Sequence, residues 1–200
     1  MPAPDSILPP SLSPGRARPL LSLGETVGVA QGRVHEICGP ARRTLAVMLA
    51  ARAAGPVLWA LPAWRREYLY PPGLAAFLDP ARLIRAACPK PVDLLWTAEE
   101  ALRSGAVGAV VAELEAPPAL TPVRRLQLAA EAGGGRVTAF LLTPETGGAP
   151  GVESRWHAAP RPGGGWRLRR LRARMAPEAE FDLPDSCASA HHSPAPLAPS

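Results

Sequence analysis

Residues 33–45, RVHEICGPARRTL, decide the fold that the sequence predicts. Val34–Cys38 is a short strand candidate, a Gly-Pro turn interrupts it, and a helix rich in alanine and leucine is expected over 42–54. A second apolar run, over 57–61, is short enough to be a buried strand. Because a strand, a helix and a strand in this order form a β-α-β unit, we expect parallel strands joined by a right-handed crossover.

The same alternation continues along the chain. Helices are expected over 94–103 and 121–132, the first with Asp93 as its cap and Gly105 at its end, the second with Pro122 at its first position. A short helical turn is expected over 72–77, and further strands over 83–87, 106–112 and 136–142. The run 106–112 is apolar throughout, as is typical of a central parallel strand. The sequence therefore predicts an open, three-layer α/β domain with a mostly parallel sheet.

The character of the chain changes after Thr143. Two apolar and basic runs, 155–157 and 166–169, flank the turn sequence PRPGGG and predict an antiparallel hairpin, with one more edge strand at 181–183. Many of the 26 prolines lie at the two ends. We therefore expect a disordered, Pro-rich tail over 1–22, an α/β domain over 23–184 whose C-terminal hairpin covers about 153–184, and a second disordered tail over 185–200.

The composition limits the possible functions only weakly. The formal net charge of +5 would attract nucleic acid or an acidic partner, but a compositional bias toward Ala, Arg, Pro and Gly is the preferred explanation. The three cysteines, Cys38, Cys88 and Cys187, form no metal or disulfide pattern, and His191 and His192 beside Cys187 lie in the expected tail. We expect a cytoplasmic protein with no metal, signal peptide or membrane span.

The turn after the first predicted strand does not match a working phosphate loop, whose pattern is GxxxxGK[ST]. Counted from Gly39, the lysine and the hydroxyl residue would fall at positions 45 and 46, which are Leu45 and Ala46. Anchoring the pattern on Thr44 instead makes the loop two residues too short, replaces the lysine by Arg43 and leaves out the second glycine. This degenerate loop predicts no bound cofactor and no catalytic residue.

Carboxylates follow the predicted central strand, where a nucleotide-hydrolysing enzyme holds Mg²⁺. Glu113 stands at that position, with Glu115 two residues further on. Without a phosphate loop, we expect both to be solvated surface groups. Glu99 and Glu100 are likewise expected on the solvated face of their helix.

At this point the sequence carries a family resemblance. The blocks RVHEICGP, GPVLWALP, LYPPGLAAFLDPARLI, DLLWTAEEALRSGAVGAVVAEL and LTPVRRLQLAAEAGGG resemble, in this order, the ImuA family of damage-inducible mutagenesis proteins. These proteins are diverged relatives of the RecA recombinase and are sometimes named SulA-like. The resemblance covers about 23–183 and implies a RecA-like scaffold.

Departures from RecA bear on function. Glu113 takes the place of the Mg²⁺-holding aspartate, and the strand that ends near Pro62 lacks the glutamate with which RecA activates water. The segment 143–151 stands where RecA has a DNA-binding loop, but Glu145 is its only charged residue and it has no aromatic one. A Pro-rich tail replaces the arm that joins RecA subunits. The resemblance therefore implies a scaffold whose ATP site, DNA loops and filament arm are eroded.

The resemblance implies a non-catalytic accessory role in SOS-induced translesion synthesis. The implied partners are an ImuB-like inactive relative of the Y-family polymerases and the α-subunit of an error-prone polymerase, with RecA itself as a further contact. Two alternatives stay open: a weak RecA-like protein that binds ATP or DNA, and a SulA-like inhibitor of cell division.

Two groups of residues are candidate contacts for a partner or for DNA. Tyr68 and Tyr70 belong to the stiff LYPPGL block; with Trp59 and Leu69 they either bind a partner or complete the core. The second group is expected to form a basic stripe on one strand face beside Trp166, although it would equally protect an edge strand from pairing. Its members are Arg167, Arg169, Arg170 and Arg172.

Overall fold

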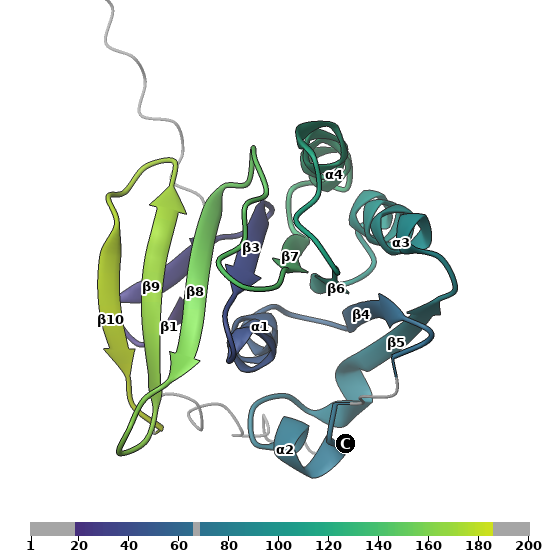
Figure 1. The fold of residues 1–200 in the computed structure, drawn as a ribbon. Coiled ribbons are helices and arrows are strands. Elements are labelled where there is room, and N and C mark those ends of the chain that lie inside the picture. The colour runs from purple at the N-terminus through teal and green to yellow at the C-terminus, as the bar shows by residue number, and fades with distance from the viewer. Residues whose placement is uncertain (1–18, 66–68, 186–200) are drawn as a thin grey trace, which may run out of the picture.

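Strands of the C-terminal hairpin and of the parallel unit join in one sheet. The computed structural model describes residues 19–65 and 69–185. Within them an eight-stranded sheet has the order β10-β9-β8-β3-β7-β6-β4-β5 (Figure 1). The parallel strands are β3 (Val34–Cys38), β4 (Val57–Pro62), β5 (Leu83–Cys88), β6 (Ala109–Glu113), β7 (Thr138–Leu142) and β8 (Ser154–Pro160). Antiparallel β9 (Trp166–Ala173) and β10 (Ala179–Leu183) complete it. The predicted α/β class and the C-terminal antiparallel hairpin are confirmed.

Helices cover both faces of the sheet and enclose two hydrophobic cores. On one face lie α1 (Arg42–Ala51), the short helix α2 (Pro71–Ala75) and a hairpin of β1 (Leu20–Leu23) and β2 (Val27–Ala30). On the other face lie α3 (Pro91–Ser104) and α4 (Leu120–Ala132), as Figure 1 shows. A 3₁₀ turn, η1 (Pro80–Arg82), leads into β5. All five residues of β6 are buried, as expected for a strand with helices on both sides.

Two helix starts differ from the prediction. Helix α3 begins at Pro91, and the Asp93 carboxylate accepts a hydrogen bond from the Lys90 backbone N–H at 3.1 Å, so Asp93 lies inside the first turn and is not the cap. Helix α4 begins at Leu120, which places Pro122 third. Proline fits any position in the first turn, because those N–H groups have no partner within the helix. The predicted end of α3 at Gly105 is confirmed by its left-handed φ of 67°.

The β1–β2 hairpin lies partly in the region that we expected to be a disordered tail. Strand β1 starts at Leu20, so ordered structure begins before the predicted boundary at residue 23. Alternate residues of both strands are buried against α1: Leu21, Leu23, Val27 and Val29. This period-2 alternation across a Gly-Glu-Thr turn is the sequence signal of a hairpin.

His35 links this hairpin to the sheet. The ring is buried; Nε2 lies 2.9 Å from the Ala30 carbonyl oxygen of β2, and Nδ1 lies 2.7 Å from the Ser154 hydroxyl of β8. In the neutral ring, Nε2–H donates to Ala30 and Nδ1 accepts from Ser154, so both nitrogens are satisfied. Burial disfavours the imidazolium and lowers the pKa of His35 from 6.5 to about 4.

This pKa shift predicts acid sensitivity of the fold. Between pH 6.5 and pH 4 the unfolded chain binds a proton at His35 that the folded chain excludes, so the free energy of unfolding falls as the pH falls. The expected loss attributable to His35 is about 3 kcal/mol at most. Urea unfolding of the wild type and of His35→Gln across this range measures it, and the variant should show a flatter dependence on pH. Identical pH slopes for the two proteins would contradict this role.

Candidate functional site

The candidate site lies where β3 ends at the carboxyl edge of the parallel strands. Ligands of open α/β sheets bind at this edge, next to the turn into the following helix. Gly39 begins the turn with a φ of +88°, and a Cβ at this position would lie 2.5 Å from the Ala158 carbonyl oxygen. Glycine is therefore required by the close approach of β8.

Three backbone N–H groups of this turn are already used inside the protein. Gly39 N–H donates to the Glu145 carbonyl oxygen at 3.1 Å, and Ala41 N–H donates to that of Ala158 at 2.9 Å. Arg42 N–H points back to the Gly39 carbonyl oxygen at 3.3 Å, and Pro40 has no N–H. A working phosphate loop leaves such groups free to surround the ligand. Residues 39–42 of this turn therefore offer no phosphate cradle.

Glu113 is buried at the end of β6 with three side chains donating to it. It is only 3% exposed. Arg43 Nε lies 3.1 Å from both carboxylate oxygens, and Arg43 Nη2 lies 2.8 Å from Oε2. Trp59 Nε1 donates to Oε1 at 2.8 Å, and Arg65 Nη1 lies 3.4 Å from Oε2. The expectation that Glu113 is a solvated surface group was wrong, because a buried carboxylate needs such partners.

Arg43 and Glu113 thus form an ion pair with each other. The sequence placed Arg43 at the position of the phosphate-binding lysine and Glu113 at the position of the Mg²⁺ ligand. Their forked contact is the geometry in which a guanidinium binds a carboxylate most strongly. The contact neutralises the two charges that a magnesium nucleotide would need.

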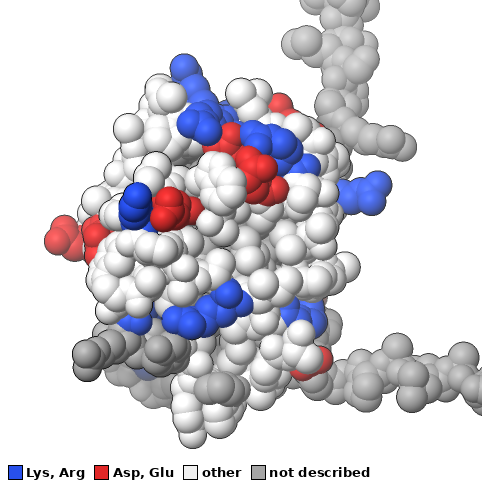
Figure 2. Space-filling view, turned by 90° about the vertical axis from the view of Figure 1, so that its right-hand side faces the viewer, with Lys and Arg blue, Asp and Glu red and all other residues white. Residues whose placement is uncertain are grey.

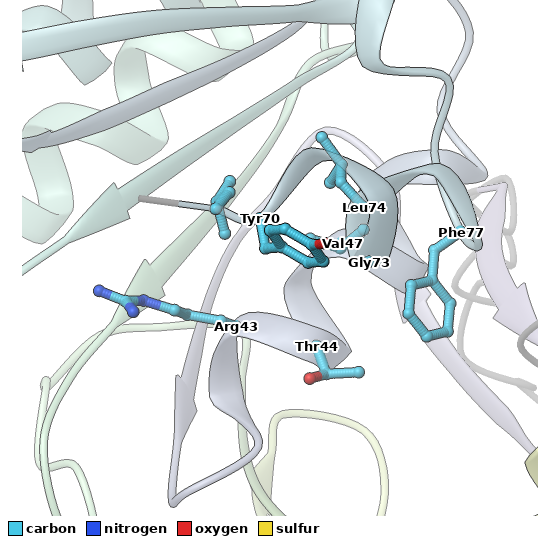
Figure 3. A pocket seen from close by; sticks show the side chains of 8 residues that line it. Arg43, Thr44, Val47, Tyr70, Gly73, Leu74 and Phe77 are labelled. Carbon is cyan, nitrogen blue, oxygen red and sulfur yellow. The ribbon is translucent and has the colours of Figure 1, made fainter. Parts of the chain in front are cut away.

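Tyr70 and Thr44 lie in a neighbouring pocket between α1 and α2. The pocket holds about 260 Å³, and Val47, Leu74 and Phe77 supply much of its apolar lining. Figure 3 shows the Tyr70 ring in this pocket, with the Arg43 guanidinium extending away from it. Tyr70 is 72% exposed and so does not complete the core. Leu69 is partly buried and packs against the core. Tyr68 lies outside the described residues.

Glu36 is a buried carboxylate that sequence reasoning missed. It lies on β3 and accepts hydrogen bonds from Thr143 Oγ1 at 2.7 Å and from the backbone N–H groups of Gly148 and Ala149 at 2.8 and 3.0 Å. Arg155 Nε lies 2.5 Å away and balances the charge. These contacts fix the connection between β7 and β8 against the sheet. A glutamate in the middle of a half-apolar strand candidate, between His35 and Ile37, was the available signal.

Cys38 gives no reactive thiol at this edge. It is fully buried, and burial raises the pKa of its thiol to about 11, so the protonated form persists. Among the residues that the structure describes, no three His, Cys, Asp or Glu side chains are grouped so as to hold a metal ion.

The predicted basic stripe on β9 is divided between two faces. Arg170 pairs with Trp156, and its guanidinium lies over the Trp156 and Phe181 rings at 5.6 and 5.3 Å. Arg167 and Arg169 lie on the opposite face, because their partners on β8 are Ala159 and His157. A register shift returns Arg172, opposite Arg155, to that second face. The expectation of one face for all four arginines was therefore wrong.

Acidic side chains of β10 further reduce the basic character of this face. Arg167 Nε lies 3.2 Å from Glu180 Oε1 and 3.3 Å from Asp182 Oδ1, and Arg169 Nε lies 3.7 Å from Glu180 Oε2. Hydrogen bonds from Arg161 and Arg167 lower the pKa of Asp182. The exposed face of the hairpin thus carries both signs of charge.

An exposed apolar surface on α3 and α4 was not predicted. Trp96 is 60% exposed on α3, and Val92 lies one turn before it; on α4, Leu128 is also exposed. Trp96 and Val92 line a groove with Leu126 and the aliphatic part of Arg125. Figure 2 looks at this side of the molecule and shows a broad area without charged side chains. Basic and acidic side chains lie next to each other along the border of this area. The helical spacing of Trp96 from Glu100 and Arg103 was the signal for its exposure.

The fold and this edge define a class: a three-layer α/β protein in which an ion pair between Arg43 of α1 and Glu113 of β6 bridges the carboxyl edge of the parallel strands. No model of a protein family matches the chain. Two curated relatives, each named Protein ImuA and from two strains of Caulobacter vibrioides, are 35% identical to it over 176 residues, which is 73% of this chain and 70% of theirs. The chain belongs to the ImuA family. Within its described residues, no helix is both long enough and apolar enough to cross a membrane.

Removal of the Glu113 carboxylate should destabilise the fold. Glu113→Ala leaves the buried Trp59 N–H without its acceptor and removes the carboxylate that pairs with Arg43, so we expect a loss of roughly 2–4 kcal/mol in the free energy of unfolding. Glu115→Ala is the matched control: this carboxylate is exposed and accepts from Trp64 Nε1, and its loss should cost less than about 0.5 kcal/mol. Chemical denaturation compares the two, and equally small losses would show that the Glu113 contacts contribute little.

Substitutions of the β9 arginines should differ in their effect on the free energy of unfolding. Arg170→Gln removes the cation that lies over the Trp156 and Phe181 rings, so we expect a loss of roughly 0.5–2 kcal/mol in the free energy of unfolding. The triple variant Arg167→Gln, Arg169→Gln, Arg172→Gln changes only exposed side chains and should unfold almost like the wild type. Thermal unfolding of both variants tests the assignment, which fails if the triple variant is the less stable one.

Proposed function

We propose that this protein is a non-catalytic accessory protein of SOS-induced, error-prone translesion DNA synthesis. Membership of the ImuA family supports the pathway. The observation that carries the non-catalytic part is the forked Arg43–Glu113 contact, which occupies the positions of the phosphate cation and of the Mg²⁺ carboxylate. The central place of β3 in the sheet supports the RecA-like scaffold that the resemblance implies.

In this proposal the protein acts through protein–protein contacts in the cytoplasm. Its partners are an ImuB-like inactive polymerase homologue and the α-subunit of an error-prone polymerase, with RecA as a further contact. An exposed tryptophan among apolar neighbours is typical of partner surfaces, and Trp96 with Val92 and Leu126 in one groove supplies one. Tyr70 is a second exposed aromatic side chain suited to this role.

Two alternative functions would require different binding properties of the protein. A weak RecA-like ATP- or DNA-binding protein needs free donors for phosphate, and the mixed charges around Arg167 and Arg169 favour it less than a uniform basic stripe would. A SulA-like inhibitor would bind the division GTPase instead of the mutagenesis proteins. Co-purification from DNA-damaged cells, followed by identification of the bound proteins, distinguishes these functions.

Variants in cells test the proposal directly. Thr44→Ala removes the hydroxyl that a working phosphate loop would use, and damage-induced mutagenesis should stay at the wild-type level. Trp96→Asp should keep the fold but reduce recovery of the ImuB-like partner by roughly 30-fold, the effect of a hot-spot residue. Met175→Asp is the matched control, because Met175 is also apolar and is 89% exposed near the other end of the sheet, between β9 and β10.

The outcomes separate the classes. Loss of mutagenesis in Thr44→Ala, with normal expression and circular dichroism, would contradict the non-catalytic role. Equal recovery of the ImuB-like partner by Trp96→Asp and by Met175→Asp would exclude the α3–α4 surface as the contact.

A further inference from the structure

The pocket between α1 and α2 is an apolar hollow with an exposed aromatic ring. Val47 and Leu74 form buried parts of its lining, Phe77 closes one side, and Tyr70 lies over it (Figure 3). A small apolar segment that presents proline to an aromatic ring would suit such a pocket, because a pre-extended proline segment loses little conformational entropy on docking.

The described chain ends beside this pocket. Leu183, near the end of β10, pairs with Trp166 of β9, and the Trp166 ring lies edge-on to Phe77 with 6.0 Å between the ring centroids. Asp185 is held there, because its Oδ1 accepts a hydrogen bond from the Gly165 backbone N–H at 3.0 Å. Figure 1 shows the β8–β9 turn and α2 at the same end of the molecule. The residues after Asp185 therefore start next to a residue that lines the pocket.

The N-terminal segment leaves from the opposite end of β8. Leu20 pairs with Ala30 in the β1–β2 hairpin. The His35 ring bridges the Ala30 carbonyl oxygen and the hydroxyl of Ser154, which is the first residue of β8. Trp166 instead pairs with Pro160, the last residue of that strand. The length of β8, about 20 Å, thus separates the two exits.

We propose that residues 193–198, Ser-Pro-Ala-Pro-Leu-Ala, dock into the pocket of their own chain, with Leu197 as the apolar anchor and the prolines against Tyr70. Twelve residues from Asp185 to Leu197 can extend to about 40 Å, so the anchor reaches the pocket easily. A short tether gives an effective concentration on the order of 1 mM, at which even a weak contact is substantially occupied. The docked segment covers Tyr70 and so limits access of other proteins to this surface.

Amide NMR spectra of the ¹⁵N-labelled chain test this inference. Removal of residues 193–200 should shift the amide signals of Val47, Gly73 and Leu74, and Leu197→Asp in the full chain should produce the same shifts. Ile7→Asp, an apolar-to-acidic change in the N-terminal segment, is the matched control and should leave these signals unchanged. Circular dichroism of each variant verifies that the domain stays folded.

A peptide of residues 193–200, added to the truncated chain, should move the same signals back toward their full-length positions in a saturable way. Unchanged signals on truncation would overturn the proposal. Shifts that depend on protein concentration, with a dimer in sedimentation that truncation abolishes, would overturn it too, because the segment of a second copy would then fill the pocket. Either result leaves the proposed accessory function untouched, since that function rests on membership of the ImuA family and on the Arg43–Glu113 contact.

Discussion

The contact between Arg43 and Glu113 is the interaction on which the candidate site depends. It joins the start of α1 to the end of β6, and Trp59 adds a bond from β4. A carboxylate this deeply buried would be costly without donors, so these partners are required for the fold itself. The same contact pairs the cation with the carboxylate inside the protein. One ion pair thus stabilises the fold and also supports the proposal that this edge does not act on a nucleotide.

The other buried polar residues of strand β3 are also hydrogen-bonded to protein groups. Glu36 faces one side of the sheet and holds the β7–β8 connection, while His35 faces the other and holds the β1–β2 hairpin. Protein groups satisfy the hydrogen-bonding capacity of both side chains. The centre of the sheet thereby holds the hairpin and the β7–β8 connection in place. Exposed side chains suited to recognition lie away from it, as on the α3–α4 surface.

The sequence predicted the elements well where periodicity and turn residues agree. The parallel strands, α1, the order of helices and the C-terminal hairpin followed from apolar runs punctuated by Gly and Pro. The β1–β2 hairpin was missed because a Pro-rich neighbourhood obscured its alternation. The loss of the phosphate loop was readable from Gly39, Arg43 and Leu45, but the burial of Glu113 was not. Pairing of Arg43 with a residue 70 positions away depends on tertiary packing, which local pattern does not encode.

Direct titration of the full chain with magnesium-ATP tests the central claim most sharply. Isothermal calorimetry, together with thermal unfolding at increasing ATP concentration, should show no saturable heat and no rise in melting temperature up to millimolar ligand, because the donors of residues 39–42 and the charges of Arg43 and Glu113 are engaged. A ligand that binds only the folded state raises stability with concentration, so even weak binding would be detected. Saturable stabilisation by ATP that Thr44→Ala abolishes would contradict the account.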